Sequence, residues 1–150
     1  MKIIKPIELT DAILSNSNVP ENDYPEYDPN TAYAVGEKVI VTATHSIYEA
    51  TQGGDCGDVC GTPVENKGYY PPNNTGGDSP MWLRISATNR WLAFDKKVGS
   101  QTTNLNVIQY VFTAGQIVSG IAFLNVNGVA IDILVSDPTE GVVYTDTTDL

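Results

Sequence analysis

Cys56 and Cys60 are the only cysteines of the 150-residue chain, and they lie four residues apart in a segment rich in glycine and aspartate. Two thiols this close together can form a disulfide that pins a loop if the protein meets an oxidising medium, and otherwise they remain free thiols. A structural zinc site needs four ligands, and the single histidine, His45, does not complete a set that contains two sulfurs. We therefore expect a disulfide or two free thiols here, and no metal.

Acidic side chains offer a second chemistry, because paired carboxylates can act as a general acid and a general base. That role requires two acids held at rigid positions in different environments. The acids nearest the cysteines instead fall in a segment rich in glycine and proline: Asp55, Asp58, Glu65 and Asp78. A nucleophilic triad has little support either, since the chain has one histidine and no Gly-x-Ser-x-Gly sequence. We expect a protein that is not an enzyme and needs no cofactor.

A pair of tyrosines beside two prolines is the clearest candidate for a binding motif. Tyr69 and Tyr70 can present a flat apolar ring to a pyranose, while nearby amides supply directional hydrogen bonds. Those amides belong to Asn66, Asn73 and Asn74. The alternative is that one tyrosine belongs to the core and the other covers it. The motif thus predicts either a contact with carbohydrate or a packing role.

The elements that must position these residues are short strands and turns. Hydrophobic residues make up 41% of the chain, but they occur in short runs broken by 13 glycines and 9 prolines, which argues against long helices. We expect an extended N-terminal arm over residues 1–25 and a small β module over residues 26–85. Within the module, residues 38–42 and 46–50 are predicted to form a hairpin, and residues 81–85 supply the last strand.

Residues 86–150 are predicted to form a portion of a β-sandwich of the jelly-roll type. Asn127-Gly128 is a strong signal for a tight hairpin turn, and Asp132 is expected to point away from the densest packing. The predicted strands are 107–112, 117–126, 129–135 and 142–144. Because such sandwiches carry about seven or eight strands, these cannot cover their own apolar faces. Either the chain is part of a longer protein, or a neighbouring subunit covers the exposed edge and face.

The aromatic residues near the end of the module are predicted to be structural. Trp82 and Trp91 are expected in the core rather than at a ligand platform, and Phe94 belongs to the cluster around Trp91. Arg90 and Asp95 lie beside this cluster, where they either pair as ions or remain solvated.

The charge of the chain limits its partners. Asp and Glu number 18 against 8 Lys and Arg, which gives a formal charge of −10 and a pI near 4.2. Such a chain repels a phosphate backbone, so we expect no binding to nucleic acid. No stretch has the length of a signal peptide's apolar region or of a membrane span, so we expect synthesis in the cytoplasm and no membrane insertion.

Four short motifs between residues 27 and 82 resemble the small chitin-binding carbohydrate modules of bacterial chitinases. They are Tyr27-x3-Thr31-Ala32-Tyr33-x2-Gly36-x2-Val39, Tyr48-Glu49-Ala50, Gly68-Tyr69-Tyr70-Pro71 and Pro80-Met81-Trp82. The resemblance implies a three-stranded unit whose structural residues are Tyr33, Gly36, Val39, Tyr48 and Trp82. It also implies that Tyr69 or Tyr70 is an exposed aromatic residue that stacks on a sugar ring. The chain departs from these modules in having Tyr27 where they usually carry Trp.

The wider arrangement resembles minor tail and baseplate proteins of long-tailed bacteriophages. It consists of the arm, the module and the segments 88–95 and 98–103. The resemblance implies a structural subunit of the tail tip, located in the virion, that contacts other tail subunits as part of a symmetric oligomer. It also implies a jelly roll after the module. A second reading is an adhesin that contacts polysaccharide on the host surface through the aromatic loop.

Overall fold

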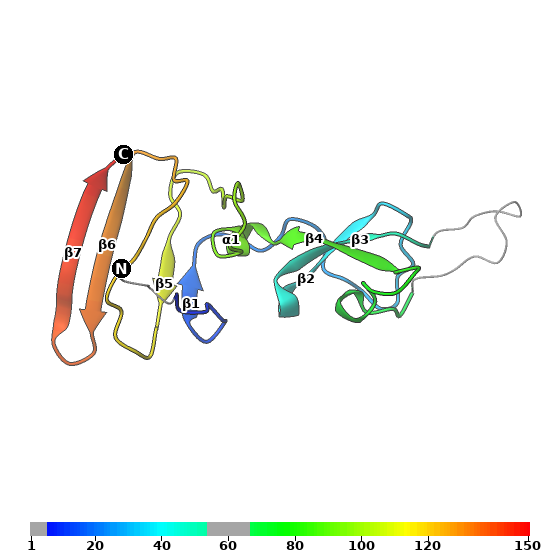
Figure 1. Cartoon of the computed structure of the whole chain (residues 1–150), viewed down its shortest axis with the longest axis horizontal. Helices are drawn as coiled ribbons and strands as arrows, with labels where there is room; N and C mark the ends of the chain where they lie inside the picture. Colours follow the sequence, from blue (N-terminus) through cyan, green and yellow to red (C-terminus); the bar gives the residue numbers. More distant parts are fainter. Residues whose placement is uncertain (1–5, 54–66) are drawn as a thin grey trace, which may run out of the picture. The chain divides into compact units, whose positions relative to one another are not determined.

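Antiparallel strand pairs make up most of the regular structure of the chain (Figure 1). The structure is a computed structural model, and it describes residues 6–53 and 67–150. Strands predominate and helix is almost absent in the described residues, so the predicted all-β class is confirmed. The chain divides into two units, one ending at Ile117 and one spanning Val118–Leu150.

A three-stranded antiparallel sheet forms the centre of the first unit. It consists of β2 (Lys38–Val41), β3 (Ser46–Ala50) and β4 (Trp82–Ala87), in the order β2-β3-β4. Strands are therefore present at all three places where the sequence predicts them in the module. A 3-10 turn, η1 (Thr42–Thr44), joins β2 to β3 and ends at His45, whose backbone is left-handed with φ 48° and ψ 42°.

The core of this sheet is built from side chains on one face of the strands. Val39 pairs with Tyr48 across the β2–β3 ladder, and Ala50 pairs with Trp82 across the β3–β4 ladder. Directly opposed residues of an antiparallel pair share a face, so this pairing brings apolar groups together. The buried cluster contains Tyr33, Val39, Val41, Tyr48, Ala50 and Trp82.

Tyrosine rings close the open side of that core. Tyr27 stacks on Tyr33 with ring centroids 5.8 Å apart, and the edge of Trp82 meets both rings at 5.8 and 5.3 Å. Burial raises the pKa of the Tyr27 hydroxyl above its ordinary value, and the neighbouring Tyr33 adds to the rise. Tyr27, which stands where the chitinase modules usually carry Trp, is thus part of the packing.

Gly36 has a different role from the other predicted core residues, because it is exposed. Its φ of +88° is a conformation that residues with a Cβ rarely adopt. The Gly36 N–H donates to the Ala50 carbonyl at 2.8 Å, and the Glu37 N–H donates to the Ala34 carbonyl at 3.0 Å. Gly36 therefore supplies the turn that leads the chain into β2.

The N-terminal arm is paired rather than free. Strand β1 (Leu14–Ser17) forms an antiparallel pair with β5 (Tyr110–Phe112), far away in the sequence. Between β4 and β5, the short helix α1 (Asn89–Leu92) carries the buried Trp91. Phe94 is half-buried and contacts Trp91, Tyr110 and Phe112, with ring centroids 6.0, 4.8 and 5.8 Å away. A second aromatic cluster thus connects the arm-bearing strand pair to α1.

The second unit contains one hairpin, formed by β6 (Ala130–Asp137) and β7 (Gly141–Asp149). The hairpin predicted at Asn127-Gly128 is wrong, because the turn lies at residues 138–140. Asp137 Oδ1 accepts the backbone N–H groups of Thr139 and Glu140 at 2.7 and 3.1 Å, and these bonds hold the pKa of Asp137 below its ordinary value. The turn is therefore stabilised by an aspartate side chain, as is common in turns.

The strand predicted over residues 117–126 is also absent, since these residues have no regular structure. Asn125 has a φ of +54°, which breaks an extended backbone. Asp132 is exposed, whereas Ile131 and Ile133 are half-buried, so the expected orientation of Asp132 is confirmed. No helix in the described part of the chain is long and apolar enough to span a membrane.

Candidate functional site

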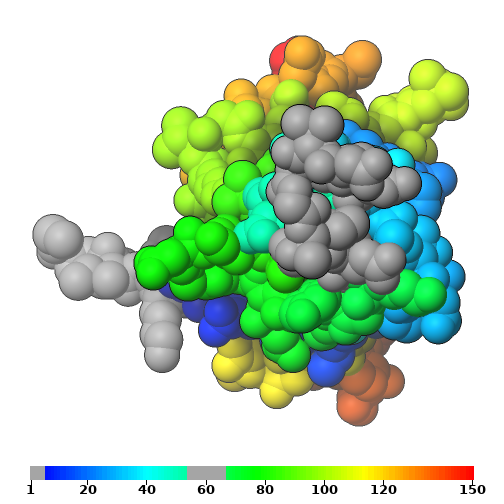
Figure 2. Space-filling view, turned by 90° about the vertical axis from the view of Figure 1, so that its right-hand side faces the viewer, coloured from blue at the N-terminus to red at the C-terminus, as the bar shows by residue number. Residues whose placement is uncertain are grey.

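The segment 67–80, which carries Tyr69 and Tyr70 and which we call the aromatic loop, is held against the sheet by backbone hydrogen bonds. It contains the 3-10 turn η2 (Pro71–Asn73), in which the Asn73 N–H donates to the Tyr70 carbonyl at 3.1 Å. Pro71, the first residue of this turn, is buried. Figure 2 shows this side of the molecule, where the segment 67–80, in green, lies at the surface.

The two tyrosines of this loop face different surroundings. Tyr70 packs against the module core, with its ring centroid 6.0 Å from that of Tyr27. Tyr69 is 44% exposed, and its backbone carbonyl accepts the Trp82 Nε1–H at 2.8 Å. The loop backbone is thus fixed from the core, while the Tyr69 ring is available at the surface.

The two asparagines predicted to bind sugar are also separated. Asn74 is used internally, because its Nδ2 donates to the Tyr70 carbonyl at 2.7 Å and its own carbonyl accepts the N–H groups of Met81 and Trp82, both at 3.1 Å. Asn73 is exposed. The structure therefore leaves Tyr69 and Asn73 at the surface and gives Tyr70 and Asn74 structural contacts. Asn66, Cys56 and Cys60 lie outside the described residues, so the disulfide stays a prediction.

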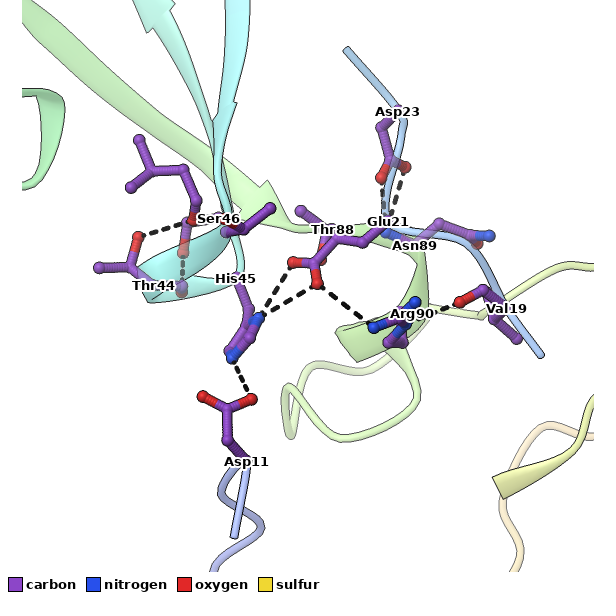
Figure 3. A network of polar contacts seen from close by, with 12 residues as sticks. Asp11, Val19, Glu21, Asp23, Thr44, His45, Ser46, Thr88, Asn89 and Arg90 are labelled. Carbon is purple, nitrogen blue, oxygen red and sulfur yellow. Dashed lines mark hydrogen bonds and ion pairs between the residues drawn. The ribbon is translucent and has the colours of Figure 1, made fainter. Parts of the chain in front are cut away.

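A cluster of polar side chains lies where the arm, the β2–β3 connection and α1 meet (Figure 3). We call it the His45 cluster, and its members are Asp11, Glu21, His45, Thr88 and Arg90. His45 Nε2 lies 2.9 Å from Asp11 Oδ1, and His45 Nδ1 lies 3.0 Å from Glu21 Oε1. Thr88 Oγ1 donates to Glu21 Oε1 at 2.8 Å.

Glu21 is the central acceptor of the His45 cluster. Its side chain is only 7% exposed, so the carboxylate depends on protein donors in place of water. The guanidinium of Arg90 lies 3.8 Å from Glu21 Oε2, and Arg90 Nε donates to the Val19 carbonyl at 2.7 Å. Of the two alternatives left open for Arg90 and Asp95, the structure does not form the ion pair: Arg90 lies beside Glu21, and Asp95 accepts from the Lys97 N–H and the Ser100 hydroxyl.

The His45 ring is engaged on both its edges and on one face. Both ring nitrogens have a carboxylate partner, and the ring stacks on Trp91 at 4.1 Å with an angle of 21° between the planes. A general base needs a ring nitrogen that can reach a substrate proton, and neither nitrogen is free for it in this structure. The geometry is suited to holding the arm against the module and α1.

Further contacts support the same role for the arm. Val19 is fully buried, and Asp23 accepts the Asn89 N–H with both carboxylate oxygens at 3.1 and 3.2 Å. This places the carboxylate at the first residue of α1, where an acceptor satisfies a backbone N–H that has no partner within the helix. The arm is thereby joined to the segment after β4 through side chains as well as through β1.

Sequence reasoning missed the His45 cluster. It considered His45 only as a metal ligand and placed Asp11 and Glu21 in an extended arm without assigned partners. The one available signal was the isolated histidine at the end of a predicted hairpin turn, which gave no indication of partners 24 and 34 residues away. Among the described residues, no group of three or more His, Cys, Asp or Glu side chains is placed to hold a metal ion.

The hairpin of the second unit exposes most of its apolar side chains. None of its residues between Val118 and Leu150 is buried, and only Ile131 and Ile133 are half-buried. The central part of the hairpin carries an exposed group that we call the apolar patch. It consists of Leu134, Val135, Val142, Val143 and Tyr144, which are 68, 41, 61, 50 and 53% exposed. Because successive strand residues point to opposite faces, these side chains are distributed over both faces of the hairpin.

No protein-family model matches the chain, and neither a curated protein nor a solved structure matches it. The class is therefore defined by the fold and the surfaces alone. It is an all-β chain with a three-stranded module, an arm fastened to that module, and a hairpin unit without a core of its own.

Proposed function

We propose that this chain is a structural subunit of a bacteriophage tail tip or baseplate, and that it assembles through protein–protein contacts. The observation that carries the assembly role is the apolar surface of the second unit. A two-stranded hairpin alone is marginally stable in water, and neighbouring apolar side chains that remain exposed mark an interaction surface. The resemblance of the sequence to minor tail and baseplate proteins supports the tail as the site of assembly.

The fastening of the arm is consistent with such a role. A subunit of a large particle must transmit force between its contacts, and the arm here is joined to the module and to α1 by β1, Val19 and the His45 cluster. These contacts hold the arm in place within the first unit. No step of this proposal requires a reaction at His45.

The experiment that tests this function is immunogold labelling of intact virions released by the source culture, using an antibody raised against the full chain. Gold at one end of the tail is the expected result, and mass spectrometry of the same purified virions should detect the chain. Labelling that is absent from virions, together with the chain remaining in the supernatant of the lysate, would overturn the proposal. A tail sheath protein serves as the positive control for particle purity.

A second candidate function is binding of carbohydrate at the Tyr69 surface, and the favouring observation is the exposed ring on a fixed backbone. A tyrosine ring held in place loses little entropy when a sugar stacks on it. Titration of the full chain with soluble chitin oligosaccharides tests this, with Tyr69→Ala as the variant. Tyr24→Ala is the matched control, because Tyr24 is also an exposed tyrosine, at 38%. Loss of binding in both variants, or binding by neither parent nor variant, would refute a site at Tyr69.

A further inference from the structure

The acidic residues of the second unit lie on both sides of the apolar patch. In the strand register, Val135 pairs with Tyr144 and Ser136 pairs with Val142, which leaves Val143 as the extra residue of a bulge. The turn beyond this region carries Asp137 and Glu140. Toward the open end of the hairpin lie three more acids: Asp132, Asp146 and Asp149.

The charge of this unit has one sign. Residues 118–150 contain the five acids named above and no Lys, Arg or His, so their formal charge is −5, half of the −10 of the whole chain. Asp132 accepts a hydrogen bond from the Thr147 hydroxyl at 2.8 Å and Asp146 accepts one from the Thr148 hydroxyl at 3.2 Å. Neither bond supplies a positive charge. The unit therefore has an apolar centre and an uncompensated acidic rim.

This pattern specifies the chemistry of its partner. Interfaces combine an apolar centre with a polar rim, and charges across the rim determine which partner is accepted. A second copy of this unit would bring five further negative charges to the same surface, which opposes association at ordinary ionic strength. Lys and Arg around an apolar strand or face would instead match it.

We propose that the apolar patch docks a different protein, one that adds to the hairpin an apolar β-strand bordered by lysine and arginine. This inference rests on the proposed assembly function and names the kind of neighbour involved. Among the residues that the structure describes, β6 is the only strand paired with β7, so the other edge of the nine-residue β7 can supply backbone donors and acceptors for a strand of that neighbour. The acids at both ends then set its register and exclude self-association.

The test uses the full chain and two synthetic strand peptides, one alternating valine with lysine and one alternating valine with glutamate. Isothermal titration should detect the lysine peptide only, with an affinity that falls as NaCl rises from about 50 to about 500 mM. Asp146→Lys should weaken binding about tenfold through loss of one attraction and gain of one repulsion. Asp78→Lys is the matched control, because it makes the same charge change at an exposed position of the first unit and should leave the affinity unchanged.

Three outcomes would overturn this inference. Equal binding of both peptides would show that the acidic rim selects nothing, and binding by neither would show that the surface does not accept a basic strand. A stable homo-oligomer at low salt that Val143→Lys dissociates would identify a second copy as the neighbour. In that last case the proposed assembly function would stand. That function is refuted separately, by the absence of the chain from virions.

Discussion

Replacing Glu21 is the sharpest test of the first unit, because one carboxylate there serves two elements distant in the sequence. Glu21→Ala removes the acceptor of the Thr88 hydroxyl at 2.8 Å and of His45 Nδ1 at 3.0 Å. It also removes the negative charge 3.8 Å from Arg90 Nη1. The arm then keeps β1, Val19 and the polar contacts of Asp11 and Asp23, but loses the acceptor at the centre of the His45 cluster.

The expected loss follows from the burial of each partner. A hydrogen bond to a charged group contributes about 1.5–3 kcal/mol, so two such bonds to a carboxylate that is 7% exposed give an upper figure of about 6 kcal/mol. Solvent reaches His45 and Arg90, whose side chains are 22 and 32% exposed, and rehydration reduces the figure. We expect Glu21→Ala to lower the free energy of unfolding by about 3 kcal/mol, and Glu21→Gln by about half as much, because the amide keeps one oxygen acceptor.

Urea unfolding followed by tryptophan fluorescence measures the stability of the first unit, to which Glu21 belongs. Both tryptophans, Trp82 and Trp91, are buried in the first unit, so the signal does not depend on the hairpin. Glu49→Ala is the control, because its ion pair with Lys38 at 3.5 Å is partly exposed and should contribute about 0.5 kcal/mol. A loss for Glu21→Ala no larger than that of Glu49→Ala would refute the role assigned to the His45 cluster.

Three further predictions concern other parts of the chain. Trp82→Ala should cost about 4 kcal/mol in the same urea assay, because it opens the module core and frees the Tyr69 carbonyl; a loss below about 1 kcal/mol would contradict that core. Burial raises the pKa of Tyr110, so folding favours its neutral hydroxyl, and stability should fall as the pH rises above about 10. Tyr110→Phe should lower the free energy of unfolding by about 1 kcal/mol at neutral pH, because it loses the hydrogen bond to the Arg90 carbonyl. The same variant should lose less stability at alkaline pH than the parent, and an equal loss would show that Tyr110 does not cause the decline. Asp137→Ala should speed amide exchange at Thr139 and Glu140, measured by NMR, while leaving β2 and β3 unchanged.

Local patterns in the sequence were sufficient to predict the module. The β-branched and aromatic residues around Val39 and Tyr48 marked two strands, and the short connection between them indicated an antiparallel pair. Trp82 and Trp91 were expected in the core and are 0 and 8% exposed. These features depend on neighbours within a few residues, which is the range over which periodicity and turn residues carry information.

The parts that the sequence did not reveal depend on contacts between distant segments. The pairing of β1 with β5 joins residues almost a hundred positions apart, and the His45 cluster draws on the arm, the β2–β3 connection and the segment after β4. No residue type at these positions specifies its partner. Asn127-Gly128 shows the converse failure, since a strong local turn signal yields no hairpin when the segment before it, broken at Asn125, has no strand to pair.

The candidate surfaces were predicted in part. The aromatic loop was found from Tyr69 and Tyr70, but which ring is exposed depends on how the Trp82 indole holds the loop backbone. Too few strands to cover their own apolar faces were predicted, but as part of a β-sandwich over residues 86–150; the structure has in its place one hairpin, β6–β7, while β5 pairs with β1 in the first unit. The acidic rim of this hairpin became visible only when the register placed the acids on both sides of the apolar patch.

Hydrogen exchange of the purified full chain tests the central claim most directly, namely that residues 118–150 have no core until a partner covers them. Mass spectrometry at low micromolar concentration should show amides of β6 and β7 exchanging far faster than those of β3 and β4, since an uncovered hairpin opens at little cost. The chain should sediment as a monomer in the same buffer. Amides of β6 and β7 as protected as those of β3, in a monomer, would contradict the account.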